Sequence, residues 1–207
     1  MSLAEALAQG LQALHLELPP DSQQKLVDYV ALIEKWNRVY NLTAVREPEK
    51  MLSHHILDSL AIAPHVSAPT LADVGSGAGL PGIPLALAYP ASAVTLIESN
   101  HKKSAFLKQA VIELELANVS VETRRVEAWE EAPQFDCVVS RAFSDLGEFV
   151  TLASRLCARE GTLAAMKGVH PYDELAQIPV GFRVERVIPL EVPGLRAERH
   201  LVLVKHA

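Results

Sequence analysis

Short apolar runs alternate with helix-type segments from about residue 69 onward, and this alternation constrains the fold more than any other feature. Five runs have the character of strands: TLADVG, AVTLIES, VSVETRR, FDCVVSRA and GTLAAMKG. The segments 81–89, 100–117 and 145–158 among them are predicted helices. Strands that alternate with helices form right-handed βαβ units around a mainly parallel sheet.

The end of the chain has a different pattern. Two further strand-like runs, GFRVERVIPLEV and RHLVLVKHA, are separated only by a short loop that contains Pro193 and Gly194. Strands joined by so short a loop pair as an antiparallel hairpin. We therefore expect an α/β fold with a mostly parallel seven-stranded sheet that ends in this hairpin.

The residues before the first strand are predicted to be helical. A short amphipathic helix is expected over 3–15. A second helix follows two prolines, with Asp21 or Ser22 as its N-cap, and a third covers 47–62. These patterns divide the chain into an N-terminal helical extension, 1–66, and an α/β domain, 67–207.

Composition indicates a soluble cytoplasmic protein. Hydrophobic residues make up 49% and charged residues 21% of the 207 residues, which is ordinary for globular proteins. No apolar run approaches the roughly 18 residues that a membrane span needs, and the N-terminus lacks a secretory basic region. Cys137 and Cys157 lie in apolar runs and are expected to pack as small hydrophobic side chains.

The net charge of −6 argues against a purely electrostatic nucleic-acid binder. The charge is uneven, however, because the stretch 35–50 carries four basic residues and only two acids. Basic residues also recur near the predicted strand ends, where they can form a local basic face: Lys102, Lys103, Arg124, Arg125, Arg141 and Lys167.

The stretch ADVGSGAGLPGIP follows the first strand and contains four glycines. Three interpretations are open. In the first, the glycines form a tight turn and bind nothing, and in the second they match the dinucleotide-binding pattern through Gly77-x-Gly79-x-x-Gly82. The dinucleotide hypothesis leaves too little chain for a second nucleotide-binding half and a substrate domain. The third register is Asp73-x-Gly75-x-Gly77-x-Gly79, with an acid at the end of the strand.

This third register resembles the first motif of class I S-adenosylmethionine-dependent methyltransferases, which have a Rossmann-like fold with a terminal antiparallel hairpin. An acid beside the loop suits a cationic cofactor, since Asp73 can hold its ammonium group directly or through water. Glu98, at the end of the next strand, is then expected to hold the ribose hydroxyls. S-adenosylmethionine is therefore the expected cofactor.

Longer motifs resemble one family within that class. NLTAVREPEKMLSHHILDSLA, LADVGSGAGLPGIPLAL, RVEAW, FDCVVSRAF and MKG are similar to the RsmG family, also called GidB. The resemblance runs from about residue 36 to 168. It implies methylation of N7 of a guanine in the decoding-centre loop of 16S rRNA, either as naked rRNA or in a small ribosomal subunit particle.

The resemblance also implies cofactor contacts at Gly75 and at Leu80 of the loop, at the Val126-Glu127 pair, and at Arg141 of the Ser-Arg-Ala motif. Glu98 stands where many relatives have aspartate, and either carboxylate can bind two hydroxyls. Lys167, at the end of the MKG strand, is expected to contact an RNA phosphate or guanine O6. Arg141 and Lys167 are the candidate catalytic residues.

The expected chemistry needs no general base, because guanine N7 has a free lone pair and no proton. Catalysis should come from alignment of N7 with the methyl group. The Ser140-Arg141-Ala142-Phe143 stretch is not the Asn/Asp-Pro-Pro-aromatic signature of exocyclic-amine methyltransferases. Cys137 likewise lacks the Pro-Cys context of cytosine-C5 enzymes.

For several residues the sequence leaves two roles open. His54 and His55 are expected to pack the helix or face RNA, and no metal is expected there. Phe143 either stacks on a flipped-out base or packs in the core, and Asn41 and Thr43 either cap helices or shape the substrate cleft.

Two alternatives to an rRNA methyltransferase remain at this stage. The first is a small-molecule methyltransferase, and the second is a non-catalytic module that binds S-adenosylmethionine. The basic stretch 35–50 favours the rRNA enzyme over both alternatives. A salt-dependent affinity of the purified protein for rRNA would distinguish it from them. A monomer is expected.

Overall fold

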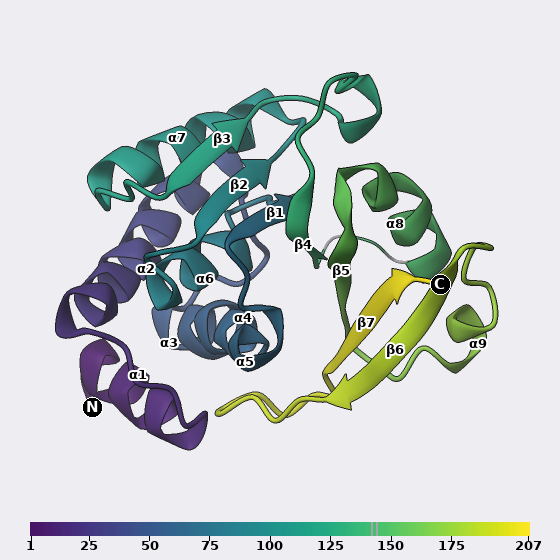
Figure 1. The fold of residues 1–207 in the computed structure, drawn as a ribbon. Helices are drawn as coiled ribbons and strands as arrows, with labels where there is room; N and C mark the ends of the chain where they lie inside the picture. Colours follow the sequence, from purple (N-terminus) through teal and green to yellow (C-terminus); the bar gives the residue numbers. More distant parts are fainter. Residues whose placement is uncertain (142, 144) are drawn as a thin grey trace.

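The computed structural model describes residues 1–141, 143 and 145–207 (Figure 1). These residues contain one seven-stranded sheet in the order β3-β2-β1-β4-β5-β7-β6. Its parallel part is β1 (Thr70–Val74), β2 (Ala93–Ile97), β3 (Val119–Glu122), β4 (Phe135–Ser140) and β5 (Cys157–Lys167). The antiparallel hairpin is β6 (Phe182–Pro189) and β7 (His200–His206), which joins the sheet through β5. The predicted sheet and terminal hairpin are confirmed.

The helices between the parallel strands lie where the sequence predicts them, with shorter bounds. They are α6 (Gly82–Ala88), α7 (His101–Glu113) and α8 (Leu146–Ala153). The prediction of a helix over 145–158 was wrong at its end. A 3₁₀ turn, η3 (Ser154–Leu156), follows α8, and β5 already begins at Cys157, because apolar residues there pair with β4.

The first 66 residues form helices. These are α1 (Leu3–Ala13), α2 (Pro20–Tyr40), α3 (Pro48–Met51), the π-helix η1 (Leu52–Leu57), α4 (Asp58–Leu60) and α5 (Ala63–Val66). Pro19, without a side-chain cap, precedes α2, so the predicted N-cap at Asp21 or Ser22 was wrong. The prolines set the backbone angles for the first turn without a capping side chain.

Each face of the sheet has its own hydrophobic core. Strand residues alternate in direction, so Leu71 of β1 packs with the N-terminal helices, α6 and α7, whereas Ala72 packs toward α8. Tyr29, fully buried in α2, and Phe106 of α7 belong to the first of these cores. The N-terminal helices therefore share a continuous core with the sheet and its glycine loop.

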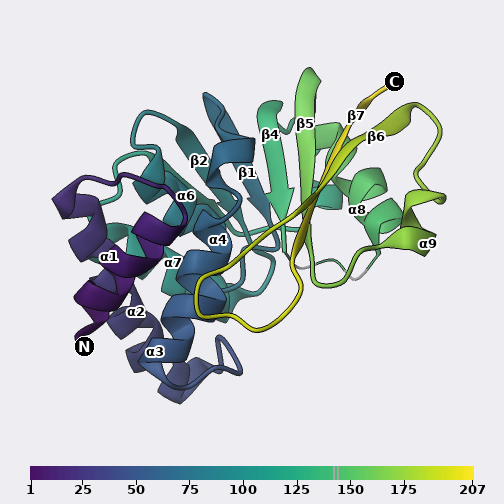
Figure 2. The ribbon, with the colours of Figure 1, turned by 90° about the horizontal axis from the view of Figure 1, so that it is seen from below.

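The loop between β6 and β7 reaches back toward the N-terminal helices (Figure 2). Pro193 and Gly194 line a hollow together with residues of α1 and η1. This return brings the start of β7 beside the end of β5, where Lys167 pairs with His200 in the ladder. Pro193 and Gly194 also lie beside residues of α1 and η1 that precede them by more than a hundred positions.

Candidate functional site

The glycine loop follows β1 at the edge where the parallel strands end. Gly75, Gly77 and Gly79 all have left-handed backbone angles, with φ of 70°, 60° and 88°. Side chains with a Cβ rarely adopt these angles. At Gly77 an added Cβ meets only a backbone oxygen, that of Gly75 at 3.8 Å, so the backbone there faces open space. A small molecule can approach this loop closely.

Asp73 lies beneath the loop and is completely buried. Its Oδ2 accepts a hydrogen bond from the Gly82 amide at 2.9 Å, which anchors the start of α6. Its Oδ1 is buried with no hydrogen-bond partner among residues 1–141, 143 and 145–207. Burial raises the pKa of this carboxyl to about 7, although the Gly82 amide opposes the shift. The unpaired oxygen is suited to a cationic or hydrogen-bonding ligand.

Glu98 follows β2 and reaches the same loop. Its Oε2 accepts from the Gly77 amide at 2.9 Å, and its Oε1 accepts from the Asn100 amide at 2.7 Å. An ionised carboxylate has about four acceptor sites, so two backbone hydrogen bonds leave room for hydroxyl donors. Glu98 therefore holds the loop in shape and retains acceptor capacity.

The other predicted cofactor residues surround this loop. Leu80 is buried at its far end, and Val126 is buried at the start of the 3₁₀ turn η2 (Val126–Ala128), whereas Glu127 is exposed. The Tyr29 hydroxyl donates to the carbonyl of Ala78, so α2 braces the loop from below.

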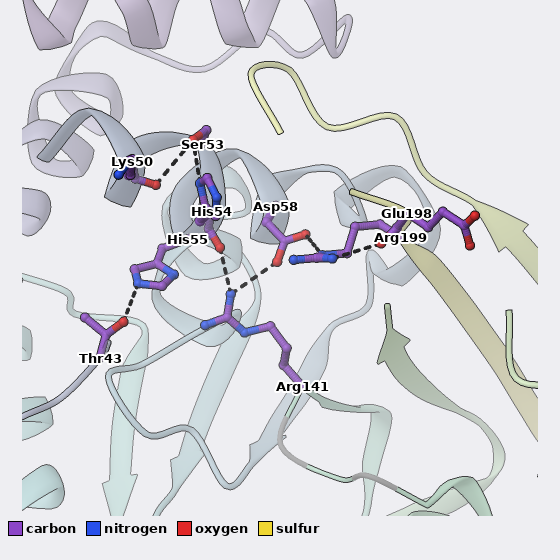
Figure 3. Close-up of polar contacts among 9 residues, drawn as sticks. All are labelled: Thr43, Lys50, Ser53, His54, His55, Asp58, Arg141, Glu198 and Arg199. Atoms are coloured by element: carbon purple, nitrogen blue, oxygen red, sulfur yellow. Dashed lines mark hydrogen bonds and ion pairs between the residues drawn. The ribbon is translucent and has the colours of Figure 1, made fainter. Parts of the chain in front are cut away.

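A buried carboxylate joins two arginines beside the loop (Figure 3). Asp58 accepts from Nη1 of Arg141 at 3.2 Å through Oδ2, and from Nε of Arg199 at 2.9 Å through Oδ1. The Asp58 side chain is 2% exposed, whereas those of the arginines are 27% and 25% exposed. The guanidinium groups are thus held in place while part of each faces solvent.

The π-helix η1 supplies the neighbouring wall. The carbonyl of His54 accepts a second hydrogen bond from Arg141 Nη1, at 3.2 Å. His55 is buried, and its Nε2 lies 2.8 Å from Oγ1 of Thr43. Burial and then the charge of Arg141 lower the pKa of His55 to about 4, so the ring is neutral near pH 7. A π-helical turn often marks a functional position.

These groups line an open cleft of about 400 Å³. The end of β5 completes it with Lys167, whose Nζ lies 2.8 Å from Oε2 of Glu174. The structure therefore brings Arg141 and Lys167 into one cleft, as their positions at strand ends predict. Besides Lys167 and the Asp58 network, the cleft is lined by Val45, His54, His55, Met166 and Gly168.

The remaining predicted residues have clear places. The half-buried Phe143 packs on Phe149, with ring centroids 5.5 Å apart. Cys137 and Cys157 are free and buried, as expected, and burial raises the pKa of Cys137 to about 12. Ala142 of the Ser-Arg-Ala motif lies outside the described residues.

Asn41 ends α2 in a left-handed conformation, and its Oδ1 accepts from Arg46. Thr43 binds His55 and the amide of Val45, next to the cleft. Asn41 thus marks a helix end, whereas Thr43 does not line the cleft itself but supports two residues that do, His55 and Val45.

Asp58 and Arg199 were missed by the sequence analysis. A charged residue inside the apolar stretch 51–62 was the available signal for Asp58, because an acid on a buried helix face needs a partner. Arg199 gave no comparable signal, since its partner lies 141 positions away.

Two kinds of feature are absent from residues 1–141, 143 and 145–207. No group of three or more His, Cys, Asp or Glu side chains there is arranged to hold a metal ion. No helix within the same residues has the length and apolar character needed to cross a membrane.

Solved structures share this fold. An S-adenosylmethionine-dependent methyltransferase from Aquifex aeolicus is 18% identical, with a TM-score of 0.57, over 75% of this chain and 92% of that one. M. jannaschii TYW2 in complex with AdoMet is 15% identical, with a TM-score of 0.56, over 74% and 76% of the two chains. The fold is that of class I S-adenosylmethionine-dependent methyltransferases.

The family follows from closer similarity. The family model GidB, rRNA small subunit methyltransferase G, matches residues 22–202. The ribosomal RNA small subunit methyltransferase G of Nitrosospira multiformis is 56% identical over 100% of this chain and 99% of its own length. The chain belongs to the GidB family, rRNA small subunit methyltransferase G, as its motifs predict.

Proposed function

We propose that this protein transfers the methyl group of S-adenosylmethionine to N7 of a guanine in the decoding-centre loop of 16S rRNA. One observation carries the proposal: in a chain of the GidB family, the left-handed glycine loop and the cleft with Arg141 lie at the same edge of the sheet. Ligands of open α/β sheets bind at this edge.

The cofactor is proposed to lie across the loop formed by Gly75, Gly77 and Gly79. The open space at Gly77 and the unpaired Oδ1 of Asp73 fit a ligand with a cationic methionine part. Asp73 acts on the ammonium group directly or through water, and Glu98 receives the ribose hydroxyls. Leu80, Val126 and Glu127 complete the surroundings of the cofactor. When bound, S-adenosylmethionine supplies an electrophilic sulfonium methyl.

The target guanine is proposed to enter the cleft of about 400 Å³. Guanine O6 accepts hydrogen bonds, and both candidate catalytic residues are cationic donors, whereas the lone pair of N7 stays free to attack the methyl group. Arg141 orients the base beside the cofactor site, and Lys167 contacts O6 or a phosphate. Neither residue accepts a proton from N7, because N7 carries none.

The protein's contribution to the reaction is therefore alignment and electrostatics. Asp58 fixes the guanidinium of Arg141, so little reorganisation is needed when the base arrives. The neutral His55 beside Arg141 adds no competing positive charge. A thiol with a pKa of about 12 remains protonated near pH 7, so Cys137 is not a nucleophile here.

We further propose that residues 1–66 act as a helical extension of a methyltransferase domain over 67–207, and that the protein works as a cytoplasmic monomer. The helical content before β1 supports this division, and the hydrogen bond from Tyr29 to the glycine loop joins the extension to the domain. The basic stretch 35–50 adjoins the cleft through Val45 and is a suitable RNA-facing surface.

Transfer of a labelled methyl group tests the proposal. The protein and labelled S-adenosylmethionine are incubated with small-subunit particles, stripped 16S rRNA, or a mixture of small metabolites. Label in the RNA at one decoding-centre guanine supports the proposal, and the two RNA forms show which one is the substrate. Label only in small molecules, or none with either RNA form, would contradict it. Arg141→Ala is the inactive control, and Arg159→Ala, at an exposed position near the start of β5, is the matched active control.

A further inference from the structure

An aromatic stack lies beyond the cleft, where the segment after β5 enters the short helix α9 (Tyr172–Leu175). The rings of His170 and Tyr172 are stacked, with centroids 3.8 Å apart and an angle of 30° between their planes. Tyr172 is nevertheless 75% exposed. One face of the tyrosine ring is thus supported by His170, and its other face is open to solvent.

The stack is held in place from behind. The His170 ring meets the His200 ring edge-on, at 5.2 Å between centroids. The Nδ1–H of His200 donates to the carbonyl of Gly168 at 3.0 Å, which ties this segment to the start of β7. His170 Nδ1 is buried without a hydrogen-bond partner in the described part of the chain. The site therefore combines a supported ring with an unused polar atom.

The stack lines a groove of about 560 Å³. Arg199 lines both this groove and the cleft, so the two hollows are neighbours. In Figure 1 α9 lies beside the β6–β7 hairpin, on the opposite side of the sheet from α7. A polymer whose target residue occupies the cleft can pass its next residue over this groove.

The charges around the groove are mixed, and the acids are in part neutralised. The Glu174 carboxylate binds Lys167 at 2.8 Å and the Leu146 amide at 2.6 Å, so it points into the protein. Glu198 and Asp173 are exposed, whereas the half-buried Arg199 lines both hollows. The groove thus favours flat, uncharged rings over a second phosphate group.

We propose that the His170–Tyr172 stack binds the base of a nucleotide next to the target guanine in the substrate RNA. The inference rests on the proposed function. When a guanine is flipped out of a loop, the neighbouring base loses its stacking partner. Proteins commonly stack such unstacked bases on aromatic side chains.

Three variants test this role. Tyr172→Ala removes the ring, Tyr172→Phe keeps the ring and removes only the hydroxyl, and Ile112→Ala truncates an exposed side chain on the distant helix α7. Methylation kinetics are measured with small-subunit particles. Affinity for stripped 16S rRNA is measured at about 50 and 200 mM salt, and cofactor affinity by calorimetry.

Tyr172→Ala should raise KM for the particle and weaken rRNA binding about tenfold, the loss of one stacked base, or roughly 1.4 kcal/mol. Cofactor affinity and kcat should stay within twofold. The tenfold ratio should be the same at both salt concentrations, because stacking releases no counterions. Tyr172→Phe and Ile112→Ala should behave like the parent protein.

Other results would overturn the inference. These are an unchanged KM in Tyr172→Ala, a similar loss in Tyr172→Phe, a ratio that shrinks with salt, or an effect on particles alone, which would indicate a ribosomal protein. If Tyr172→Ala does not fold, Tyr172→Trp provides the test, since a larger ring should bind RNA at least as tightly. Failure of the parent protein to methylate guanine N7 would instead contradict the proposed function.

Discussion

The Asp58 carboxylate binds the Arg141 guanidinium at 3.2 Å across 83 positions of sequence (Figure 3). The same carboxylate binds Arg199, which comes from the other end of the chain. Three elements, α4, the end of β4 and the start of β7, thereby meet at one buried charge. The position of the candidate catalytic arginine depends on this charge.

Asp58→Asn should lower both methylation and stability. The substitution keeps the volume of the side chain and removes the charge that two arginines share. We expect the free energy of unfolding to fall by roughly 2–3 kcal/mol. This lies below the range of about 3–5 kcal/mol for fully buried pairs, because each arginine side chain is about a quarter exposed. We also expect kcat to fall at least tenfold.

Urea unfolding and single-turnover methylation measure the two effects of Asp58→Asn. Glu34→Gln is the matched control, since it removes the acid of an exposed i,i+4 pair with Arg38 that contributes little to stability. An Asp58→Asn protein with normal stability and normal turnover would show that Arg141 is held by other contacts.

Gly77→Ala tests the cofactor loop. A Cβ at φ +60° strains the backbone and intrudes on the open side of the loop. We expect calorimetric affinity for S-adenosylmethionine to fall at least tenfold, or about 1.4 kcal/mol. Gly181→Ala is the control, because Gly181 has φ +91° with nothing within 4 Å of the added Cβ. Equal cofactor affinity in the two variants would remove the loop from the cofactor site.

Glu98→Ala should weaken cofactor binding by roughly 1.5–3 kcal/mol, since it removes a charged acceptor and releases the Gly77 amide. Calorimetry of Glu98→Ala beside Glu113→Ala, an exposed acid near the end of α7, checks this expectation. If both variants bind like the parent protein, the ribose is held elsewhere.

The protonation of His55 should make stability fall in acid. Its folded-state pKa of about 4 lies below the ordinary value of 6.5, so protons bind more tightly to the unfolded chain. The stabilising contribution is therefore complete above pH 6.5 and is lost as the pH falls toward 4, by up to roughly 3 kcal/mol.

The raised pKa of Asp73 has the opposite effect on stability. Protons bind more tightly to this carboxyl in the folded state, so its stabilising contribution is lost as the pH rises through about 7. A comparison of the parent with His55→Gln therefore isolates the histidine. On going from pH 7 to 4.5, the urea midpoint should fall further, or rise less, in the parent than in the variant. Equal differences in the two proteins would mean that His55 does not titrate in this way.

The sequence predicted the fold well because the determining signals are local. Each of these signals is contained in a short stretch of sequence. They are the alternation of strands and helices, the spacing of the glycines after β1, and the short loop of the hairpin. The end of α8 was predicted less well, because Cys157 suits an apolar helix as well as a strand, and its pairing with Phe135 decides between them.

The candidate site was only partly predictable for a related physical reason. Asp73 and Glu98 lie next to the glycines in the sheet, so their strand positions were enough to place them. Asp58 and Arg199 become site residues only when the β6–β7 loop folds back on the N-terminal helices. Long-range ion pairs of this kind leave no periodic pattern in a single sequence.

The central claim is that the methyl group goes to guanine N7 without a base or a covalent intermediate. Methylation at N7 places a positive charge on the imidazole ring, so borohydride reduces that ring and the modified base is then lost from its ribose. Aniline cleaves the RNA strand at the abasic site. After incubation of small-subunit particles with the protein and S-adenosylmethionine, reduction and cleavage should give one new break, at a decoding-centre guanine. Cys137→Ala should give the same break, and Arg141→Ala should give almost none. Methyl incorporation without that break, or loss of the break in a folded Cys137→Ala protein, would contradict the account.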